Sequence, residues 1–349
     1  MIWFPLQPRL DIGDKGHKQL WPSNRENDNV ADQKDKGRGV LDQSLPFERR
    51  LIELESHLER AASDQERQEI EGELEREREA VFANLSPWQR VQLARHAMRP
   101  RMLDYTARVF DDFIELHGDR LAMDDPAMVG GIARFQGETV MVVGQQKGVT
   151  TEDKVQRNFG MAHPEGYRKA LRLFRLAERW GLPVITFVDT PAAHPGIEAE
   201  AHGQGPAIAT NLLEMLKLRT PIFSVILGEG GSGGALGVAV GDWVAMFEHA
   251  IYVICPPERC AEILWRDVEK KEMAASALRV TAEELKELGT IDKVLAEPAA
   301  GAHRDPEAAA QTLAEEIEFF LEECKRERWT PSQRQAKFQN MGIYQETAG

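Results

Sequence analysis

The sequence predicts an α/β domain with a helix-covered sheet, preceded by a charged helical hairpin. Apolar, β-branched runs such as "LPVITFVDT" and "PIFSVIL" alternate with amphipathic runs such as "HPEGYRKALRLFRLAERWG". Strands that alternate with helices are typical of α/β folds, in which helices cover the faces of the sheet. Upstream, Leu51, Leu54 and Leu58 recur at helical spacing within a segment rich in charged residues, which predicts the hairpin.

Composition divides the chain into four segments. Residues 1–46 are polar and lack periodic apolar residues, which predicts a disordered extension. Residues 47–85 form the charged helical hairpin, with "SDQE" as the cap between its two helices. Residues 86–326 carry the α/β domain, and residues 327–349 are a polar tail that we expect to be loosely held.

Each element of the α/β domain has a local sequence signal. Ser86 and Pro87 are typical of a helix cap and a first helical residue, and Gly181 is typical of a helix end. The tripeptide "QGE" separates two strand-like runs and predicts a hairpin. The expected helices begin at 86 or cover 163–181, 203–219, 256–265 and 305–326, and the expected strands lie within 130–144, 182–190, 221–227 and 241–256.

Charge and cysteine content exclude several classes of protein. The formal net charge of the 349 residues is −14, whereas non-specific nucleic-acid binding needs a basic face. The three cysteines form no disulfide framework and fit a reducing compartment. No apolar stretch approaches the roughly 20 residues of a membrane span, and the start of the chain does not resemble a signal peptide. We therefore expect a cytoplasmic protein that binds neither nucleic acid nor membrane.

The stretch "GEGGSGGALG", residues 228–237, places five of its six glycines, those within residues 228–234, between a predicted strand and a predicted helix. Glycine costs chain entropy on folding, so this turn has a reason to need bare backbone. A P-loop would continue with Gly-Lys-Ser/Thr, whereas Ala235 follows Gly234 here. The spacing G-x-G-x-x-G also matches a dinucleotide fingerprint, with Glu248 at the place of the ribose-binding acid. The segment before the next strand is, however, too short for a normal crossover connection.

An oxyanion hole fits the glycine segment better. Adjacent glycines at the start of a helix present unshielded N–H groups, with the positive end of the helix dipole behind them. Such donors stabilise a carbonyl oxygen as it gains negative charge. A tight turn or a close strand–helix contact would account for only one or two of the five glycines. We therefore expect a functional loop, which a side chain at Gly233 or Gly234 should block without disturbing the fold.

Several motifs, in order from about residue 47 to 326, resemble the carboxyltransferase α subunits of the multi-subunit bacterial acetyl-CoA carboxylases. They are "LARH", "LHGDR", "VGGIARFQGETVMVVGQQKG", "NFGMAHPEGYRKALRLFRLAERWGLPVITFVDTP", "EGGSGGALG", "ILW" and "GAHRDPEA". The resemblance implies a crotonase-like (ClpP/crotonase) fold built from repeated β-β-α turns. It also implies an enzyme of fatty-acid synthesis, which moves a carboxyl group from carboxybiotin on the biotin carboxyl carrier protein to acetyl-CoA and so forms malonyl-CoA.

The same resemblance implies the partners of the chain. They are a β subunit with a zinc ribbon, joined in an α2β2 heterotetramer, and biotin carboxylase in the larger complex. Carboxybiotin and acetyl-CoA are substrates in this family, so no cofactor is expected to bind the chain directly. No metal site is expected either, because His194 and His202 have no convergent ligands nearby in the sequence.

The resemblance assigns the site residues by position. The oxyanion pair that faces the biotin carbonyl maps to Gly233 and Gly234, and the released biotin anion takes the proton from the acetyl methyl group, so no side-chain nucleophile is required. The expected basic residues would meet CoA phosphates or the carrier, although an ordinary solvated face is an equally good interpretation. The substrate-binding positions are Gly230, Gly231, Lys147, Lys154, Arg157, Thr190 and Pro191.

The chain departs from the family pattern around the substrate loop. It has "TPAAHPG" with Ala192 and His194 where "TPGAYPG" is common, and "GQGPAIA" with Gly205 and Pro206 where "GQSEAIA" is common. Val149 stands where a basic residue usually follows "QKG". These departures leave open a paralogue that acts on another acyl-CoA.

Two further functions remain alternatives. One is a non-catalytic scaffold that binds the β subunit, in which the helical hairpin would be the main functional element. The other is a crotonase-fold hydratase or isomerase, which would need a general acid–base carboxylate near the oxyanion hole. Glu229 is the single carboxylate inside the glycine segment.

Overall fold

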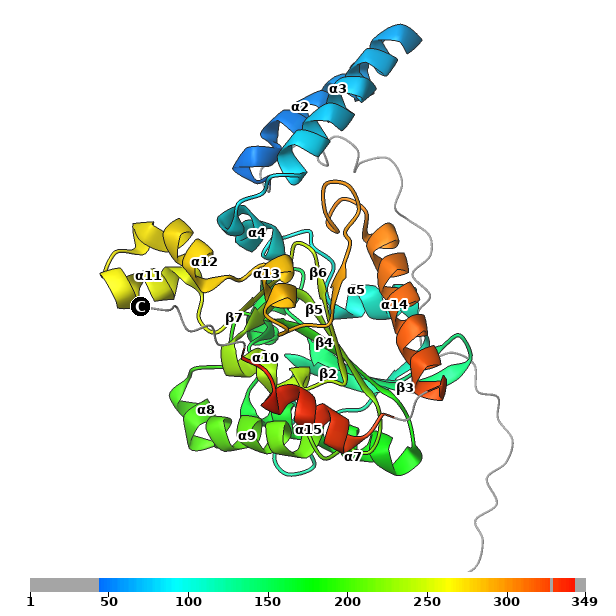
Figure 1. The fold of residues 1–349 in the computed structure, drawn as a ribbon, viewed down its shortest axis with the longest axis vertical. Coiled ribbons are helices and arrows are strands. Elements are labelled where there is room, and N and C mark those ends of the chain that lie inside the picture. Colours follow the sequence, from blue (N-terminus) through cyan, green and yellow to red (C-terminus); the bar gives the residue numbers. More distant parts are fainter. Residues whose placement is uncertain (1–43, 327–328, 343–349) are drawn as a thin grey trace, which may run out of the picture. The chain divides into compact units, whose positions relative to one another are not determined.

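The structure is a computed structural model that describes residues 44–326 and 329–342 (Figure 1). The extension expected at residues 1–46 lies almost wholly outside these residues. Its last position, Pro46, begins the short 3-10 helix η1 (Pro46–Glu48). None of the described helices is long and apolar enough to cross a membrane.

A mixed sheet of eight strands forms the centre of the described chain. Strands β1, β2 and β3 pair antiparallel, and β3, β4, β5, β6 and β8 follow as parallel neighbours. The first half of β5 pairs with β6, and its end pairs with β7. The strands are β1 (Asp111–Glu115), β2 (Met128–Phe135), β3 (Glu138–Gln145), β4 (Val184–Thr190), β5 (Ile222–Gly231), β6 (Trp243–Phe247), β7 (Ile251–Val253) and β8 (Lys293–Leu295).

Helices cover both faces of the sheet, as the alternating sequence pattern predicts (Figure 1). Helices α7, α9 and α10 lie on one face, and α5 and α14 lie on the other. The helices are α2 (Arg49–Arg60), α3 (Asp64–Phe82), α4 (Pro87–Ala94), α5 (Met102–Val109), α6 (Thr151–Gln156), η2 (Asn158–Gly160), α7 (Pro164–Trp180), α8 (Ile197–Ala201), α9 (Gln204–Met215), α10 (Ser232–Ala239), α11 (Pro257–Trp265), η3 (Val268–Lys270), α12 (Lys271–Leu278), α13 (Ala282–Glu287), α14 (Pro306–Arg326) and α15 (Pro331–Gln339).

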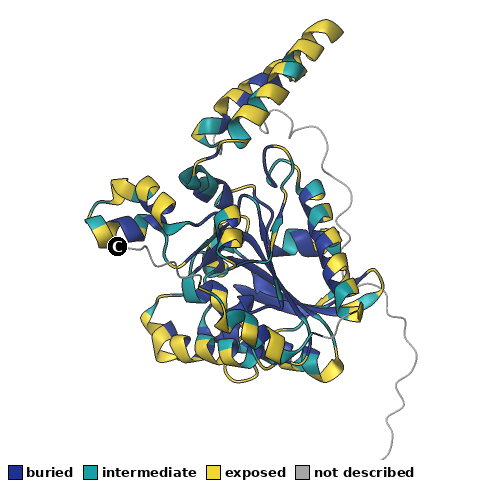
Figure 2. Cartoon of the chain, viewed as in Figure 1, coloured by how far each residue is buried: buried dark blue, intermediate teal, exposed yellow. Residues whose placement is uncertain are grey.

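The core lies along the central parallel strands. Every residue of β4 and of β5 is buried, which explains their nearly continuous apolar sequences. Helix α7 buries one face against the sheet and ends at Gly181, whose φ of 68° is left-handed, as the sequence predicts. Figure 2 shows that buried residues concentrate in the sheet and on the inner faces of its helices. Among the elements that the sequence analysis did not anticipate are β1, α6, α8, α12, α13, β8 and α15.

Helices α2 and α3 form a hairpin over residues 47–85. Leu51, Leu54 and Leu74 form a small apolar cluster between the two helices. Below it, Oε1 of Glu48 lies 2.8 Å from Nε2 of His303, which ties the base of the hairpin to the loop before α14. Burial would raise the pKa of Glu48, but the hydrogen bond and charge of His303 lower it below the usual value.

Glu48 and His303, together with His96, are also a group of potential metal ligands within the described residues. Their contacts with protein groups already account for their placement. The rings of His96 and His303 lie in tilted contact with centroids 4.1 Å apart, and Nδ1 of His96 accepts a hydrogen bond from the Met98 N–H. We assign this cluster to attachment of the hairpin.

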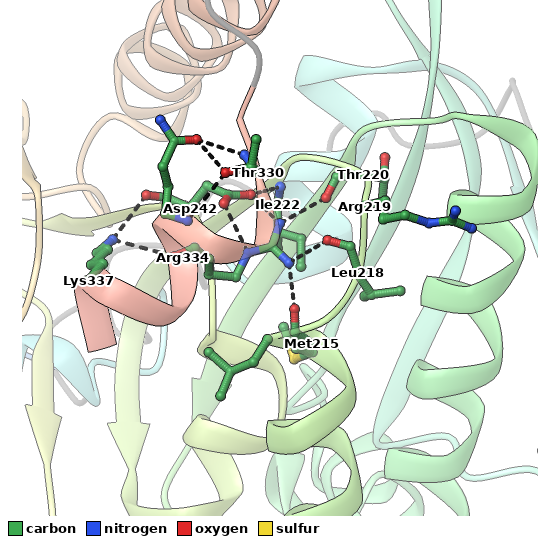
Figure 3. Close-up of polar contacts among 12 residues, drawn as sticks. Met215, Leu218, Arg219, Thr220, Ile222, Asp242, Thr330, Arg334 and Lys337 are labelled. Atoms are coloured by element: carbon green, nitrogen blue, oxygen red, sulfur yellow. Dashed lines mark hydrogen bonds and ion pairs between the residues drawn. The ribbon is translucent and has the colours of Figure 1, made fainter. Parts of the chain in front are cut away.

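The expectation of a loosely held tail at residues 327–349 is wrong for residues 331–339. These residues form α15, whose buried Arg334 lies at the starts of β5 and β6, and Figure 3 shows its polar contacts there. The guanidinium binds Asp242 through Nε at 2.9 Å and Nη2 at 2.5 Å, and it donates to the carbonyls of Met215, Leu218 and Thr220. Two long-range ionic contacts, of Arg334 with Asp242 and of Lys337 with Asp292, therefore dock a helix that has little apolar periodicity.

We predict that Arg334→Met lowers the free energy of unfolding by about 3–5 kcal/mol, because it leaves the buried carboxylate of Asp242 without its charged partner. Chemical denaturation of the full chain measures this change. Gln339→Ala, an exposed change on the same helix, is the control and should alter stability little. Equal stability of Arg334→Met and the parent chain would show that α15 does not contribute to the fold.

Candidate functional site

The glycine segment begins inside β5, not after it. The sequence analysis expected the strand to end at 227, whereas β5 continues to Gly231 and pairs there with β7. Three of the five glycines are explained by close packing at this strand end. A Cβ on Gly228 would lie 2.8 Å from Oδ1 of Asp189, one on Gly230 would lie 2.7 Å from the ring of Tyr252, and one on Gly231 would lie 1.9 Å from the carbonyl oxygen of Pro191.

The other two glycines start α10 and differ from each other. A Cβ on Gly234 would lie 2.4 Å from the backbone nitrogen of Ala193, so a side chain there would force backbone to move. A Cβ on Gly233 would make only ordinary van der Waals contact with the side chain of Ile208, at 3.8 Å, so there is room for it. Of the five glycines, Gly233 is the one for which packing offers no explanation.

The backbone at this helix start presents N–H groups in an arrangement that suits an anion. Ser232 has a left-handed φ of 52°, which is uncommon for a residue with a side chain, and the helical Gly233 follows it. Successive residues of opposite hand point their N–H groups toward one concavity. The N–H groups of Gly233 and Gly234 belong to the first turn, so they have no acceptor within the helix. They donate no hydrogen bond to any of the described residues.

Side chains from two other elements hold this turn in place. The carbonyl oxygen of Gly234 accepts hydrogen bonds from Nε2 of Gln145 at 3.0 Å and from the hydroxyl of Tyr167 at 3.1 Å. Oε1 of Gln145 in turn accepts from the N–H of Asp189 at 3.2 Å. The donors of the helix start are therefore fixed by β3, β4 and α7 before any ligand arrives.

A buried cluster of charges adjoins the strand end. Nζ of Lys147 lies 2.6 Å from Glu229 and 2.9 Å from Asp189, and Nε of Arg95 lies 2.5 Å from Glu229. Burial would raise the pKa of Glu229, but the charges of Lys147 and Arg95 hold it below the usual value. Burial opposes the charged form of Lys147, yet the two carboxylates raise its pKa. Glu229 and Lys147 are therefore both ionised at neutral pH.

These charges line a cavity of about 350 Å³. It contains Lys147, Lys154 and Pro191 among the predicted substrate-binding residues. Arg95 and Arg101 also line it, and the sequence analysis assigned no role to either, although Arg95 lies in the quoted motif "LARH". The residues that line this cavity are Ala94, Arg95, His96, Ala97, Arg99, Arg101, Lys147, Lys154, Phe159, Asp189, Pro191 and Glu229.

Other predicted residues lie elsewhere or are already engaged. Arg157 bonds to Asp153 at 2.7 Å and to the carbonyl of Pro126 at 2.9 Å, and it does not line the cavity. The Thr190 hydroxyl donates to the carbonyl of Ala192 at 2.6 Å and thereby shapes the turn after β4. Gly233 and Gly234 lie at the start of α10 and are not part of the cavity wall.

The departures from the family pattern also have definite places. The ring of His194 stacks on that of His163 with centroids 4.1 Å apart. Burial and the neighbouring His163 lower the pKa of His194, so it is neutral at pH 7. Val149 is exposed, and its N–H bonds to Asp153. Gly205 and Pro206 lie in the first turn of α9.

The sequence matches a known protein family over most of its length. The family described as "Acetyl co-enzyme A carboxylase carboxyltransferase-like" matches residues 44–342. A protein of Geobacter sulfurreducens named acetyl-coenzyme A carboxylase carboxyl transferase subunit alpha is 58% identical over 72% of this chain and 79% of its own length. Proteins with the same name from Geobacter metallireducens and a Cyanothece species are 54% and 49% identical, over 80% and 87% of this chain and 91% and 97% of their own lengths.

Solved structures show the fold. The transcarboxylase 12S structure with methylmalonyl-coenzyme A and methylmalonic acid bound aligns with 63% of this chain at a TM-score of 0.52 and 21% identity, and the alignment covers 41% of that chain. The β subunit of geranyl-CoA carboxylase from P. aeruginosa aligns with 76% of this chain and 47% of its own length, at a TM-score of 0.51 and 14% identity. The expected crotonase-like fold is confirmed. With the family match over residues 44–342 and these close relatives, the chain belongs to the family of acetyl-CoA carboxylase carboxyltransferase alpha subunits.

Proposed function

We propose that this chain is the alpha subunit of an acetyl-CoA carboxylase carboxyltransferase, which moves a carboxyl group from carboxybiotin on its carrier protein to acetyl-CoA and forms malonyl-CoA. Family membership supports the reaction, which serves fatty-acid synthesis. The observation that carries the assignment of the site is the start of α10, where Gly233 and Gly234 offer two N–H groups and where packing does not require a glycine at position 233.

The two N–H groups suit the charge that develops during transfer. The ureido oxygen of biotin becomes negative as the adjacent nitrogen loses its carboxyl group. Two fixed donors at a helix start stabilise that oxygen, and each such donor is typically worth ~3 kcal/mol of the barrier. The biotin anion then takes a proton from the acetyl methyl group, and the resulting carbanion attacks the released carboxyl carbon. No side chain of this chain needs to act as a nucleophile.

The cationic cavity beside the site suits the anionic parts of the substrates. Lys154 and Arg101 lie on its wall together with the buried ion pairs of Lys147 and Arg95. We assign to it the phosphates of CoA or acidic groups of the carrier. Phosphate is a preferred partner of both side-chain types.

The first experiment on this proposal replaces Gly233 with Val. A Cβ on Gly233 would come no closer than 3.8 Å to its neighbour Ile208, so we expect the fold to survive. We expect carboxyl transfer to fall by at least about 100-fold, because the side chain displaces the ureido oxygen from its donors. Malonyl-CoA formation by the reconstituted complex is the measurement, with circular dichroism as the control for folding. Near-normal turnover would remove the oxyanion role and favour a scaffold.

Gly234→Val is a poorer test than the sequence suggested. Its Cβ would lie 2.4 Å from Ala193 N and 2.5 Å from Ala192 C, so the change disturbs the turn itself. Loss of activity in that variant would not separate catalysis from misfolding. We therefore expect the fold to survive a substitution at Gly233, but not one at Gly234.

Glu229 does not fit the general acid–base group that a hydratase or isomerase needs. Its carboxylate is buried, and Arg95 and Lys147 engage its two oxygens. With its pKa lowered, it stays ionised across the neutral range, where a catalytic acid must exchange its proton. We assign Glu229 to positioning of the strand end.

We predict that Glu229→Gln destabilises the fold at neutral pH, because Lys147 and Arg95 each lose one of their two carboxylate partners. A carboxyl group with a depressed pKa contributes stability above its unfolded value of about 4.5 and loses it as the pH falls. The difference in unfolding free energy between parent and variant should therefore be full at pH 7 and shrink below about pH 4.5. A difference that grows toward low pH would contradict the ion-pair role.

The site is also incomplete without a partner. Transfer places negative charge on the ureido oxygen and on the thioester oxygen, and among the described residues one helix start of this kind is present. We therefore propose a zinc-ribbon β subunit as the source of the second hole, in an α2β2 heterotetramer that works with biotin carboxylase in the cytoplasm. The exposed apolar side chains of Ile197, Ile254, Ile263 and Leu264 are suited to such an assembly.

We predict that the purified chain does not form malonyl-CoA from a carboxybiotin donor, and that adding a β subunit restores turnover. The reason is that one oxyanion hole stabilises only one of the two developing charges. The measurement compares the chain alone, the β subunit alone and the mixture, after circular dichroism confirms that the chain is folded. Robust turnover by the isolated chain would point to a self-contained enzyme.

A further inference from the structure

A second and larger cavity, of about 630 Å³, lies between α7, α9 and the loop after β1. Five arginines line it, in a chain whose net charge is −14. Four of them belong to α7, namely Arg168, Arg172, Arg175 and Arg179, and Arg120 comes from the loop. No step of the proposed transfer uses this cavity.

Carboxylates neutralise only two of these arginines. Arg168 pairs with Asp119 at 3.0 Å and Glu165 at 2.6 Å, and Arg175 pairs with Glu214 at 2.9 Å. The other three, Arg120, Arg172 and Arg179, make no ion pair with any residue in the described ranges. Three arginines thus face one cavity without an ion-pair partner among the described residues.

Arg172 shows what this arrangement costs. Its guanidinium donates to the carbonyls of Leu116, His117 and Gly118, which fix its direction without neutralising it. Burial and the charge of Arg120 lower the pKa of Arg172, and nearby carboxylates offset this only in part. Like charges that are held together at such a cost are characteristic of a site for an anion.

The floor of the cavity suits an organic body. Leu171, Leu176 and Ala207 form an apolar surface between the arginines. Beside them, the buried Asn211 donates through Nδ2 to the carbonyls of Tyr167 and Gly237, while its Oδ1 has no hydrogen-bond partner. Cavities of this volume hold small organic ligands, whereas acidic protein surfaces dock on broad faces.

We propose that this groove is a binding site for an organic molecule with two linked phosphate groups, of about the size of a nucleoside diphosphate. The forked guanidiniums of Arg120, Arg172 and Arg179 bind the phosphates, and the apolar floor carries the organic part. Two sources supply this chemistry. One is the diphosphate of CoA itself, in which case the site rests on the proposed function and the smaller cavity takes the acidic groups of the carrier. The other is a free nucleotide that acts as an effector.

The test is equilibrium binding of ADP and of CoA to the full chain, by titration calorimetry at constant ionic strength. The informative variant is Arg120→Gln with Arg179→Gln, because neither side chain bonds to a described residue, so the fold should not depend on them. The matched control is Arg67→Gln with Arg76→Gln, which removes two exposed arginines of α3. Arg172→Lys is a second variant, since it keeps the charge and loses the fork.

We expect the groove variant to bind ADP at least about tenfold more weakly for each arginine removed, and the control to bind as the parent does. Arg172→Lys should also bind more weakly. Tighter binding of CoA than of ADP, with mutual competition, would identify CoA as the source, and the reverse order would identify a free nucleotide.

Three results would overturn the site. They are equal affinity in the parent and groove variant, no saturable binding at millimolar ADP and CoA, and displacement of ADP by an equal concentration of sulfate. A groove variant that loses β-subunit assembly while keeping its ADP affinity would instead identify a protein interface. Gly233→Val should bind ADP normally, so failure of the proposed transfer and failure of this site are distinguishable.

Discussion

The carboxylate of Asp189 joins the strand ends on which the site depends. It stands at the end of β4, where Oδ1 accepts the N–H of Glu229 in β5 at 3.0 Å and pairs with Nζ of Lys147 at 2.9 Å. Its own N–H donates to Gln145, whose amide reaches the carbonyl of Gly234. A buried charge is tolerated only with partners on several sides. Those partners come from the segments that must meet for α10 to begin where it does.

The cost of this arrangement appears in the backbone of β5. Asp189 approaches so closely that Gly228 can carry no Cβ, and the Pro191 carbonyl excludes one at Gly231. The glycines let β5 run under the turn that follows β4. The same close approach places the first turn of α10 with its donors outward. The position of the N–H donors of α10 and the close packing at the end of β5 therefore depend on the same contacts.

Elements with a local signal were predictable, and those held by distant contacts were not. The period of α7 and its terminal Gly181 predict that helix almost to the residue. The end of β5 was misplaced, because the sequence does not show that Tyr252 and Pro191 approach its glycines. Helix α15 was missed because it depends on Arg334, whose partner Asp242 lies 92 residues away. The sequence identified Glu229 as the carboxylate of the glycine segment. It could not show that Arg95 and Lys147 form ion pairs with Glu229, because the three residues meet only in the folded chain.

The number of glycines in the segment suggested that most of them serve function. The space around each glycine shows that packing requires most of them instead. A glycine that packs against backbone is required by the fold whatever the protein does, as Gly231 and Gly234 are. A glycine with room for a Cβ gains nothing for the fold from lacking a side chain, and in a helix it costs about 1 kcal/mol relative to alanine. Gly233 is such a residue, at the first turn of α10 and behind the left-handed Ser232. Its bare backbone is therefore consistent with the proposed approach of the ureido oxygen from outside the chain.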